Sequence, residues 1–170
     1  TGESFGAVGT SEGEVVFNTS LTGYQEVLTD PSYTGQIVTM TYPLIGNYGV
    51  NTEDIEARNG KVQVRAFVIK ELSPVVSNFR ANSSLSDYLA AEGVIGICNV
   101  DTRALTKRLR TGGAMSGVIS TEILDDVELV KRAAAIESMA GSDFVKYVRP
   151  DEKYDWVEGY NSEFAQAHRA

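Results

Sequence analysis

Residues 14–41 read EVVFNTSLTGYQEVLTDPSYTGQIVTMT, and this stretch is the most informative part of the chain. Two runs rich in apolar and β-branched residues, Glu14–Asn18 and Gln36–Thr41, predict one strand at each end. The connection between them carries hydroxyl, amide and tyrosine side chains in place of the plain polar residues of an ordinary loop. It is therefore predicted to present polar groups to a ligand or to a neighbouring domain.

The connection is also predicted to contain a short helix, Thr22–Leu28. Thr22 followed three residues later by Gln25 is a capping-box pattern, which is typical of a helix start. Asp30 stands before a proline and should end the helix, because that position is excluded from helical backbone angles. Ser32 is then expected on a turn, with its hydroxyl free to reach a ligand.

The rest of the chain predicts a mixed α/β domain, because strand and helix patterns both occur along it. Further strands are expected at Val62–Lys70, Val94–Asn99 and Ala114–Ser120, and further helices at Ser84–Ala91, Asp101–Leu109 and Asp126–Ser138. The first of these strands is largely apolar on both faces, which favours a position between two packed layers. From Gly141 onward no helix or strand period persists, so residues 141–170 are expected to form a partly ordered arm.

Composition limits the possible partners. The chain has 170 residues, a formal net charge of −8 and one cysteine. The acidic balance opposes phosphate backbones and anionic lipids, and no apolar run approaches the ~18 residues of a membrane helix, so neither nucleic acid nor a membrane is an expected partner. One cysteine allows no internal disulfide, and the start carries no basic-then-apolar leader. A cytoplasmic or organelle-matrix location is therefore expected.

Several motifs carry a resemblance to a known family. They are the opening stretch with its continuation to Gly49, Ser77-Asn78-Phe79-Arg80, Leu85-Ser86-Asp87-Tyr88-Leu89, and Asp101-Thr102-Arg103-Ala104-Leu105-Thr106. In content and order they closely resemble the small chain of glutamine-hydrolysing carbamoyl-phosphate synthase. The resemblance runs from about Phe5 to Ser120 and continues more loosely beyond.

The resemblance implies a fold and a domain organisation. Residues 1–140 would form the three-layer β/β/α domain that opens the small chain, an α/β fold. Residues 141–170 would be a linker arm towards the glutaminase domain, which is absent from this sequence. The segment would then act as a scaffold and interface.

The resemblance also implies an activity for the whole enzyme. The small chain releases ammonia from glutamine, and the large synthetase chain uses it with bicarbonate, ATP and Mg²⁺ to make carbamoyl phosphate for arginine and pyrimidines. The implied partners are the large synthetase chain, the chain's own glutaminase domain and L-glutamine. No cofactor is expected in this segment, because ATP and Mg²⁺ belong to the large chain. The alternative is a stand-alone module that binds a small polar metabolite without catalysis.

Ser32 is the candidate substrate contact. From the residues alone, a turn residue after proline is the favoured interpretation. The family places the serine of its Asp-Pro-Ser-Tyr motif in the glutamine pocket, so the resemblance implies a hydrogen bond from Ser32 to the substrate. Asn18, Tyr24, Gln25 and Asp30 are expected at the interface with the neighbouring domains.

Cys98 is the one cysteine and thus a candidate nucleophile, but the residues around it do not fit that role. A strained nucleophile elbow needs small residues on both sides, and Val100 follows two positions after Cys98. A base is also required, and the one histidine, His168, lies three residues from the end of the sequence. Cys98 is therefore interpreted as a structural residue, and no catalytic residue is expected in this segment.

Three further patterns suggest ligand binding but are interpreted as structural features. Arg103, Lys107 and Arg110 form one stripe of a predicted helix; it could read nucleic acid or dock an acidic partner, but a solvated face is favoured. The acidic loop at residues 53–56 lacks histidine, cysteine and calcium-loop spacing, so no metal is expected. Gly9–Gly13 lacks the lysine of a P-loop and is predicted to be a tight turn.

Overall fold

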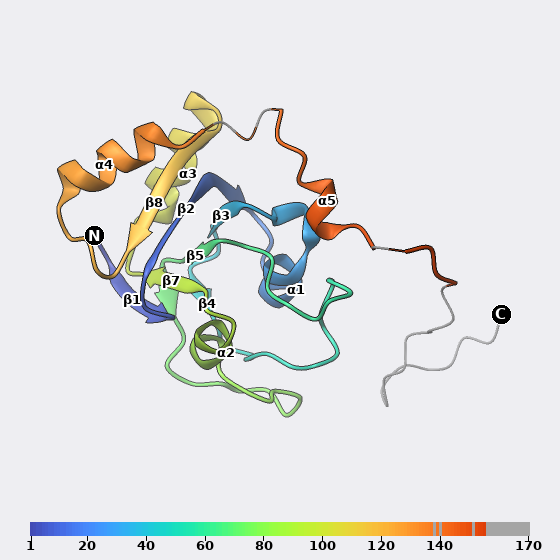
Figure 1. Ribbon diagram of the computed structural model, residues 1–170. Coiled ribbons are helices and arrows are strands. Elements are labelled where there is room, and N and C mark those ends of the chain that lie inside the picture. Colours follow the sequence, from blue (N-terminus) through green and yellow to red (C-terminus); the bar gives the residue numbers. More distant parts are fainter. Residues whose placement is uncertain (138, 140, 151, 156–170) are drawn as a thin grey trace.

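The computed structural model describes residues 1–137, 139, 141–150 and 152–155. Its centre is a six-stranded mixed sheet with helices packed on both faces (Figure 1). The sheet order is β1-β7-β5-β3-β2-β8. Its strands are β1 (Glu3–Gly6), β2 (Thr10–Asn18), β3 (Gln36–Met40), β5 (Ala66–Val68), β7 (Ile95–Cys98) and β8 (Met115–Ser120). The α/β prediction is thus confirmed.

The centre of the sheet is parallel and its two edges are antiparallel. β2, β3, β5 and β7 run in one direction, whereas β1 pairs antiparallel with β7 and β8 pairs antiparallel with β2. All three residues of β5 are buried, as expected for a central parallel strand covered on both faces. The strand predicted over Val62–Lys70 is therefore central but shorter than expected.

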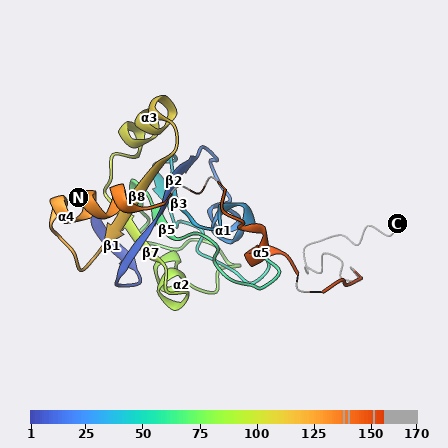
Figure 2. The same ribbon diagram turned by 45° about the horizontal axis from the view of Figure 1, so that its top comes forward.

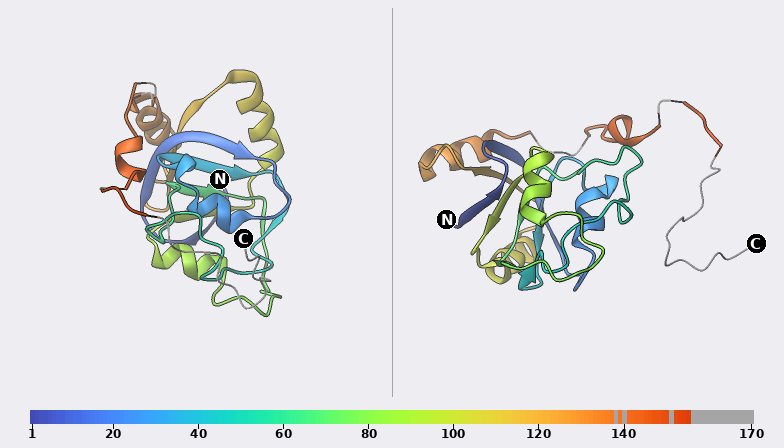
Figure 3. Two further views of the ribbon diagram at one scale, coloured as in Figure 1. Left: turned by 90° about the vertical axis from the view of Figure 1, so that its right-hand side faces the viewer. Right: turned by 90° about the horizontal axis from the view of Figure 1, so that it is seen from below.

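The helices cover the sheet from two sides because strand residues alternate between its faces. Val38 and Phe67 belong to one core cluster, to which α1 (Tyr24–Thr29) and α2 (Leu85–Ala91) contribute. Ile37 and Ala66 belong to a second cluster on the other face, against which α3 (Thr102–Gly112) packs. Figures 2 and 3 show α2 and α3 on opposite sides of the sheet.

Smaller elements complete the domain. A 3₁₀ turn, η1 (Pro31–Tyr33), follows α1, and the strand pair β4 (Leu44–Ile45) and β6 (Glu71–Leu72) forms a second, two-stranded sheet. Helix α4 (Asp126–Ala135) packs against the edge strand β8. Helix α5 (Val145–Val148) lies within the predicted arm, whereas Trp156, Tyr160 and His168 lie outside the described residues.

Two local predictions are wrong. Gly9–Gly13 is no tight turn, because Thr10–Gly13 form the start of β2 and pair with residues of β8; the long-range pairing overrides the local turn signal. The capping box at Thr22 is also absent. Helix α1 begins after Gly23, whose φ of 82° is left-handed, and no side chain of its own segment caps it. By contrast, the predicted cap at Asp101 is confirmed, since its carboxylate accepts from the Ala104 N–H at 2.9 Å.

Candidate functional site

The site is the bend formed by residues 30–33 (the Asp30 bend), which ends α1 and leads into β3. The Asp30 carboxylate accepts a hydrogen bond from the Ser32 N–H at 2.8 Å, and the Asp30 carbonyl accepts from the Tyr33 N–H at 3.0 Å. These two bonds lock the turn, as is common where an aspartate precedes a Pro-Ser pair. The stop at Asp30 that the sequence predicted is therefore confirmed.

Ser32 lies exposed at the tip of this locked turn. Within the described part of the chain, no hydrogen bond engages its hydroxyl. A serine hydroxyl can donate one hydrogen bond and accept two, so the full capacity of Ser32 is open to a ligand. The structure thus places Ser32 on an accessible turn, as predicted.

Asn18 ties the end of β2 to the same bend. Its side-chain amide donates to the Tyr33 hydroxyl at 3.0 Å, and its amide oxygen accepts from the Ser20 N–H at 2.7 Å. Asn18 is half-buried. It therefore holds the bend against the sheet while part of its side chain stays accessible.

Tyr24 and Gln25 do not face a neighbouring domain. Each is only 1% exposed, so their side chains lie inside this domain. The prediction that they lie at an interface is corrected on this ground, because a side chain already buried by its own fold offers no surface to a partner. The cause is that α1 packs against the core cluster on one side and against the loop at residues 48–56 on the other, which encloses most of its side chains.

The start of α1 is capped by a tyrosine from a distant loop. The Tyr48 hydroxyl accepts hydrogen bonds from the N–H groups of Gly23 at 2.7 Å and Tyr24 at 2.9 Å. Its ring stacks on the Tyr24 ring, with centroids 4.1 Å apart. Burial raises the pKa of Tyr48 to about 12, so the hydroxyl stays protonated. Tyr48 therefore supplies the acceptor that the predicted capping box would have supplied.

The remaining polar groups of α1 bind the loop at residues 51–56. The Gln25 amide pairs with both backbone groups of Asn51, and the Thr29 hydroxyl accepts from the Glu56 N–H at 3.0 Å. Arg80 then joins the same loop, with ion pairs to Glu53 at 2.8 Å and to Asp54 at 3.2 Å. These contacts hold α1, and hence the Asp30 bend, at a fixed place.

Sequence reasoning missed this supporting network. The missed residues are Tyr48, which caps α1, and Asn51, which pairs with Gln25. No local sequence pattern around either residue indicates a partner that lies far away along the chain. The one signal was that Tyr48 stands in the motif Gly46-Asn47-Tyr48-Gly49, which is part of the resemblance to the family. The network depends on loop geometry, which spacing along the chain does not encode.

Cys98 has the surroundings of a structural thiol. It is a buried residue of β7, and burial raises the pKa of its thiol, with nearby Glu3 acting in the same direction. A raised pKa keeps the sulfur in its unreactive protonated form. The described residues contain no histidine, so no imidazole base stands beside Cys98 there.

The basic stripe of α3 faces solvent, as predicted. Arg103, Lys107 and Arg110 are all exposed on α3. No helix in the described ranges is long and apolar enough to cross a lipid bilayer.

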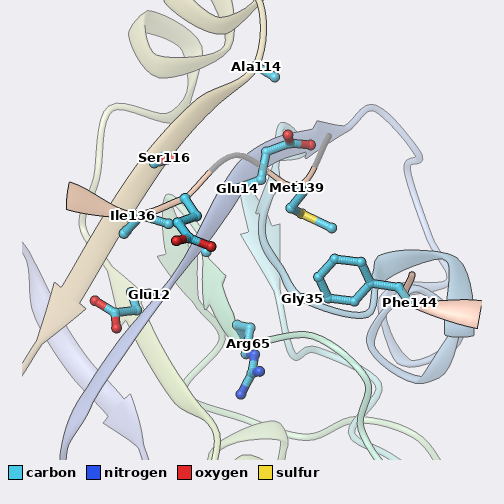
Figure 4. A pocket seen from close by; sticks show the side chains of 11 residues that line it. Glu12, Glu14, Gly35, Arg65, Ala114, Ser116, Ile136, Met139 and Phe144 are labelled. Carbon is cyan, nitrogen blue, oxygen red and sulfur yellow. The ribbon is translucent and has the colours of Figure 1, made fainter. Parts of the chain in front are cut away.

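A separate cavity of about 340 Å³ lies where the chain after α4 folds back over β2 (Figure 4). Its lining includes Glu12, Glu14 and Arg65 from the sheet side and Met139 and Phe144 from the returning chain. The sequence did not predict this cavity, because the residues that line it come from five distant segments.

The fold is a mixed α/β domain that presents a locked turn with an exposed hydroxyl. A family model described as "Carbamoyl-phosphate synthase small chain, CPSase domain" matches residues 1–119, and the chain belongs to this family. The resemblance that the motifs carried is thereby confirmed.

Individual relatives agree with this family. The chain is 59% identical over 155 residues to the carbamoyl phosphate synthase small chain of Nitratidesulfovibrio vulgaris, covering 91% of this chain and 41% of that protein. It is 53% identical over 159 residues to that of Syntrophotalea carbinolica (94% and 42%) and 52% identical over 158 residues to that of Aquifex aeolicus (93% and 42%). The chain therefore spans about two fifths of the length of the curated relatives it matches.

Proposed function

We propose that this chain is the scaffold domain of a glutamine-using carbamoyl-phosphate synthase small chain, and that Ser32 completes a glutamine pocket formed mainly by another domain. The accessible Ser32 hydroxyl on the locked Asp30 bend is the observation that carries the proposal. A rigid turn holds a polar group in position without an ordering cost at each binding event. L-Glutamine, with its amide, amine and carboxylate, offers both donors and acceptors to such a hydroxyl.

The proposed partners follow from the family. The rest of the small chain would contribute the glutaminase, and the large synthetase chain would consume the ammonia together with bicarbonate, ATP and Mg²⁺. Ammonia freed into water would be protonated and lost as a nucleophile, so the sites must be joined by an interface that excludes solvent. This chain would help to form that interface while holding no cofactor itself.

The proposed interface residues are reduced from four to two. Asn18 and Asp30 remain candidates, because both lie at or beside the Asp30 bend and are only partly buried. Tyr24 and Gln25 would act from inside, by holding α1. A cytoplasmic or organelle-matrix location, consistent with a lone buried thiol, belongs to the same proposal.

The finer fold and domain description is also a proposal. The six-stranded sheet and the β4–β6 pair would be the two β elements of the family's β/β/α arrangement, and α3, on one face of the large sheet, would belong to its helical layer. Residues 1–140 would form this domain, and residues 141–170 the arm that leads to the next one.

The test is Ser32→Ala in the complete enzyme, with both nitrogen sources measured. Loss of one substrate hydrogen bond should raise the KM for glutamine about tenfold and leave the ammonium-dependent rate unchanged. Ser77→Ala, at another exposed serine, is the matched control and should change neither rate. An equal loss with glutamine and with ammonium would contradict the proposal.

A further inference from the structure

The chain that follows α4 returns to the Asp30 bend. We call residues 141–148 the α5 strap; it contains α5 and a turn that begins at Gly141. Figure 1 shows α5 beside α1 and η1, far from the end of α4. The strap is therefore not a free extension of the domain but lies on the side that carries Ser32.

One aromatic ring and one glycine make this contact. Gly35, three residues after Ser32, is buried and has a left-handed φ of 86°. A Cβ atom at this position would lie 2.6 Å from Cε1 and 3.1 Å from Cζ of the Phe144 ring. The ring can rest directly on the backbone of residue 35 only because glycine has no side chain.

The strap has its own internal order at this contact. The Asp143 carboxylate accepts from the Lys146 N–H at 3.3 Å, and the Tyr147 N–H donates to the Phe144 carbonyl at 3.0 Å. Arg149 N–H donates to the Val145 carbonyl at 2.9 Å. A four-residue helix has little stability alone, so its position depends on its contacts with the rest of the domain.

The surroundings make Phe144 the anchor of the strap. Phe144 is half-buried, whereas its neighbours Val145 and Tyr147 are each 66% exposed. Met139 adds a second apolar contact, with its Cε 3.4 Å from the same hypothetical Cβ of Gly35. Phe144 and Met139 thus bring an apolar contact to Gly35, at the foot of the Asp30 bend.

We propose that Phe144, resting on Gly35, fixes the α5 strap so that the following domain of the small chain is held against the Ser32 side. This inference rests on the proposed function, because it requires a following domain whose pocket Ser32 completes. The proposed function concerns the contact between Ser32 and glutamine, whereas the placement of the following domain is assigned here to the contact between the Phe144 ring and Gly35. Phe144 is in this sense a positioning residue, not a catalytic one.

The test compares Phe144→Ala, Phe144→Leu and the exposed control Val145→Ala in the complete protein. Phe144→Ala should speed hydrogen exchange of the Tyr147 and Arg149 amides about fivefold, the factor expected for the loss of one partly buried contact. It should also raise the KM for glutamine about tenfold or more while sparing kcat and the ammonium-dependent rate, because small misplacements of a pocket are costly. Phe144→Leu should keep the exchange rates and the KM for glutamine close to those of the parent, and Val145→Ala should match the parent in both.

Two results would overturn the inference and leave the proposed function standing. In the first, exchange at Tyr147 and Arg149 is unchanged in Phe144→Ala, so the ring does not hold the strap. In the second, exchange rises but the KM for glutamine does not, although Ser32→Ala raises it. If neither Ser32→Ala nor Phe144→Ala alters the KM for glutamine, the proposed function fails and this inference fails with it.

Discussion

Gln25 pairs with Asn51 in the way that two backbone segments pair in a sheet. The Gln25 side-chain amide donates to the Asn51 carbonyl, and its oxygen accepts from the Asn51 N–H at 2.9 Å. Both residues are buried, so water cannot replace either bond. One side chain thus satisfies two backbone groups of a loop that has no strand partner at that point.

Replacement of Gln25 by methionine should therefore destabilise the domain. Methionine keeps the length of the side chain but leaves the Asn51 N–H and C=O buried without partners, at a cost of about 2–4 kcal/mol. Urea unfolding would measure it. Gln63→Met, at a half-buried amide that water can reach, is the control and should cost less than about 1 kcal/mol. Equal losses at the two positions would contradict the assigned role.

Tyr48→Phe should loosen the start of α1. The variant keeps the stacked ring but removes the one acceptor shared by the Gly23 and Tyr24 N–H groups, which should cost about 1–2 kcal/mol. Hydrogen exchange of those two amides should rise accordingly. Tyr42→Phe, at a tyrosine that is 40% exposed, should change stability by less than about 0.5 kcal/mol. Unchanged exchange at Gly23 and Tyr24 would show that the hydroxyl is not the cap.

Glu26→Gln should make the domain less sensitive to pH. Burial raises the pKa of the Glu26 carboxyl, and the charges of Asp54 and Glu56 act in the same direction. A folded-state pKa above the ordinary value of 4.5 means that the folded protein binds the proton more tightly than the unfolded chain. The resulting stabilisation is complete below that value and is lost as the pH rises through the raised pKa.

Thermal unfolding of Glu26→Gln and of the parent would check this sign. Glutamine cannot ionise, so the variant should gain stability relative to the parent as the pH rises from about 3.5 to about 7. A difference that stays constant over this range, or that shrinks towards neutral pH, would contradict the assignment.

Gly35→Ala should be more costly than the same change at Gly93. Both glycines have left-handed φ angles, so alanine at either position costs about 1–2 kcal/mol in backbone strain. Nothing lies within 4 Å of a Cβ at Gly93, whereas a Cβ at Gly35 meets the Phe144 ring and adds about 1–3 kcal/mol of overpacking. Adding Phe144→Ala to Gly35→Ala should recover part of that excess. Chemical denaturation of the parent, the two single glycine variants and the double variant would measure these free energies of unfolding. Equal losses at the two glycines would exclude the ring contact.

Local signals predicted the parts of the structure that depend on near neighbours. The stop at Asp30, the cap at Asp101 and the apolar runs of β2 and β3 follow from backbone preferences within a few residues. The same reasoning failed at Gly9–Gly13, where a distant strand pairs with residues that look like a turn.

In the candidate site, too, local signals predicted only the features that depend on near neighbours. Ser32 was predicted because the adjacent aspartate and proline indicate a turn and because the family motif contains this serine. Tyr24 and Gln25 were misplaced because the direction of a side chain on a six-residue helix depends on what the helix packs against. Phe144 was not singled out at all, since its partner Gly35 lies more than a hundred residues earlier.

The α/β class, the family and an exposed hydroxyl turn after α1 could be predicted from the amino-acid sequence, because they depend on periodicity, motif order and short-range backbone restrictions. Three features required the packed structure: which polar residues of the connection turn inward, the capping of α1 by Tyr48, and the return of the chain to Gly35. These features are contacts between segments far apart along the chain, and their geometry exists only after the sheet and its helices have packed together.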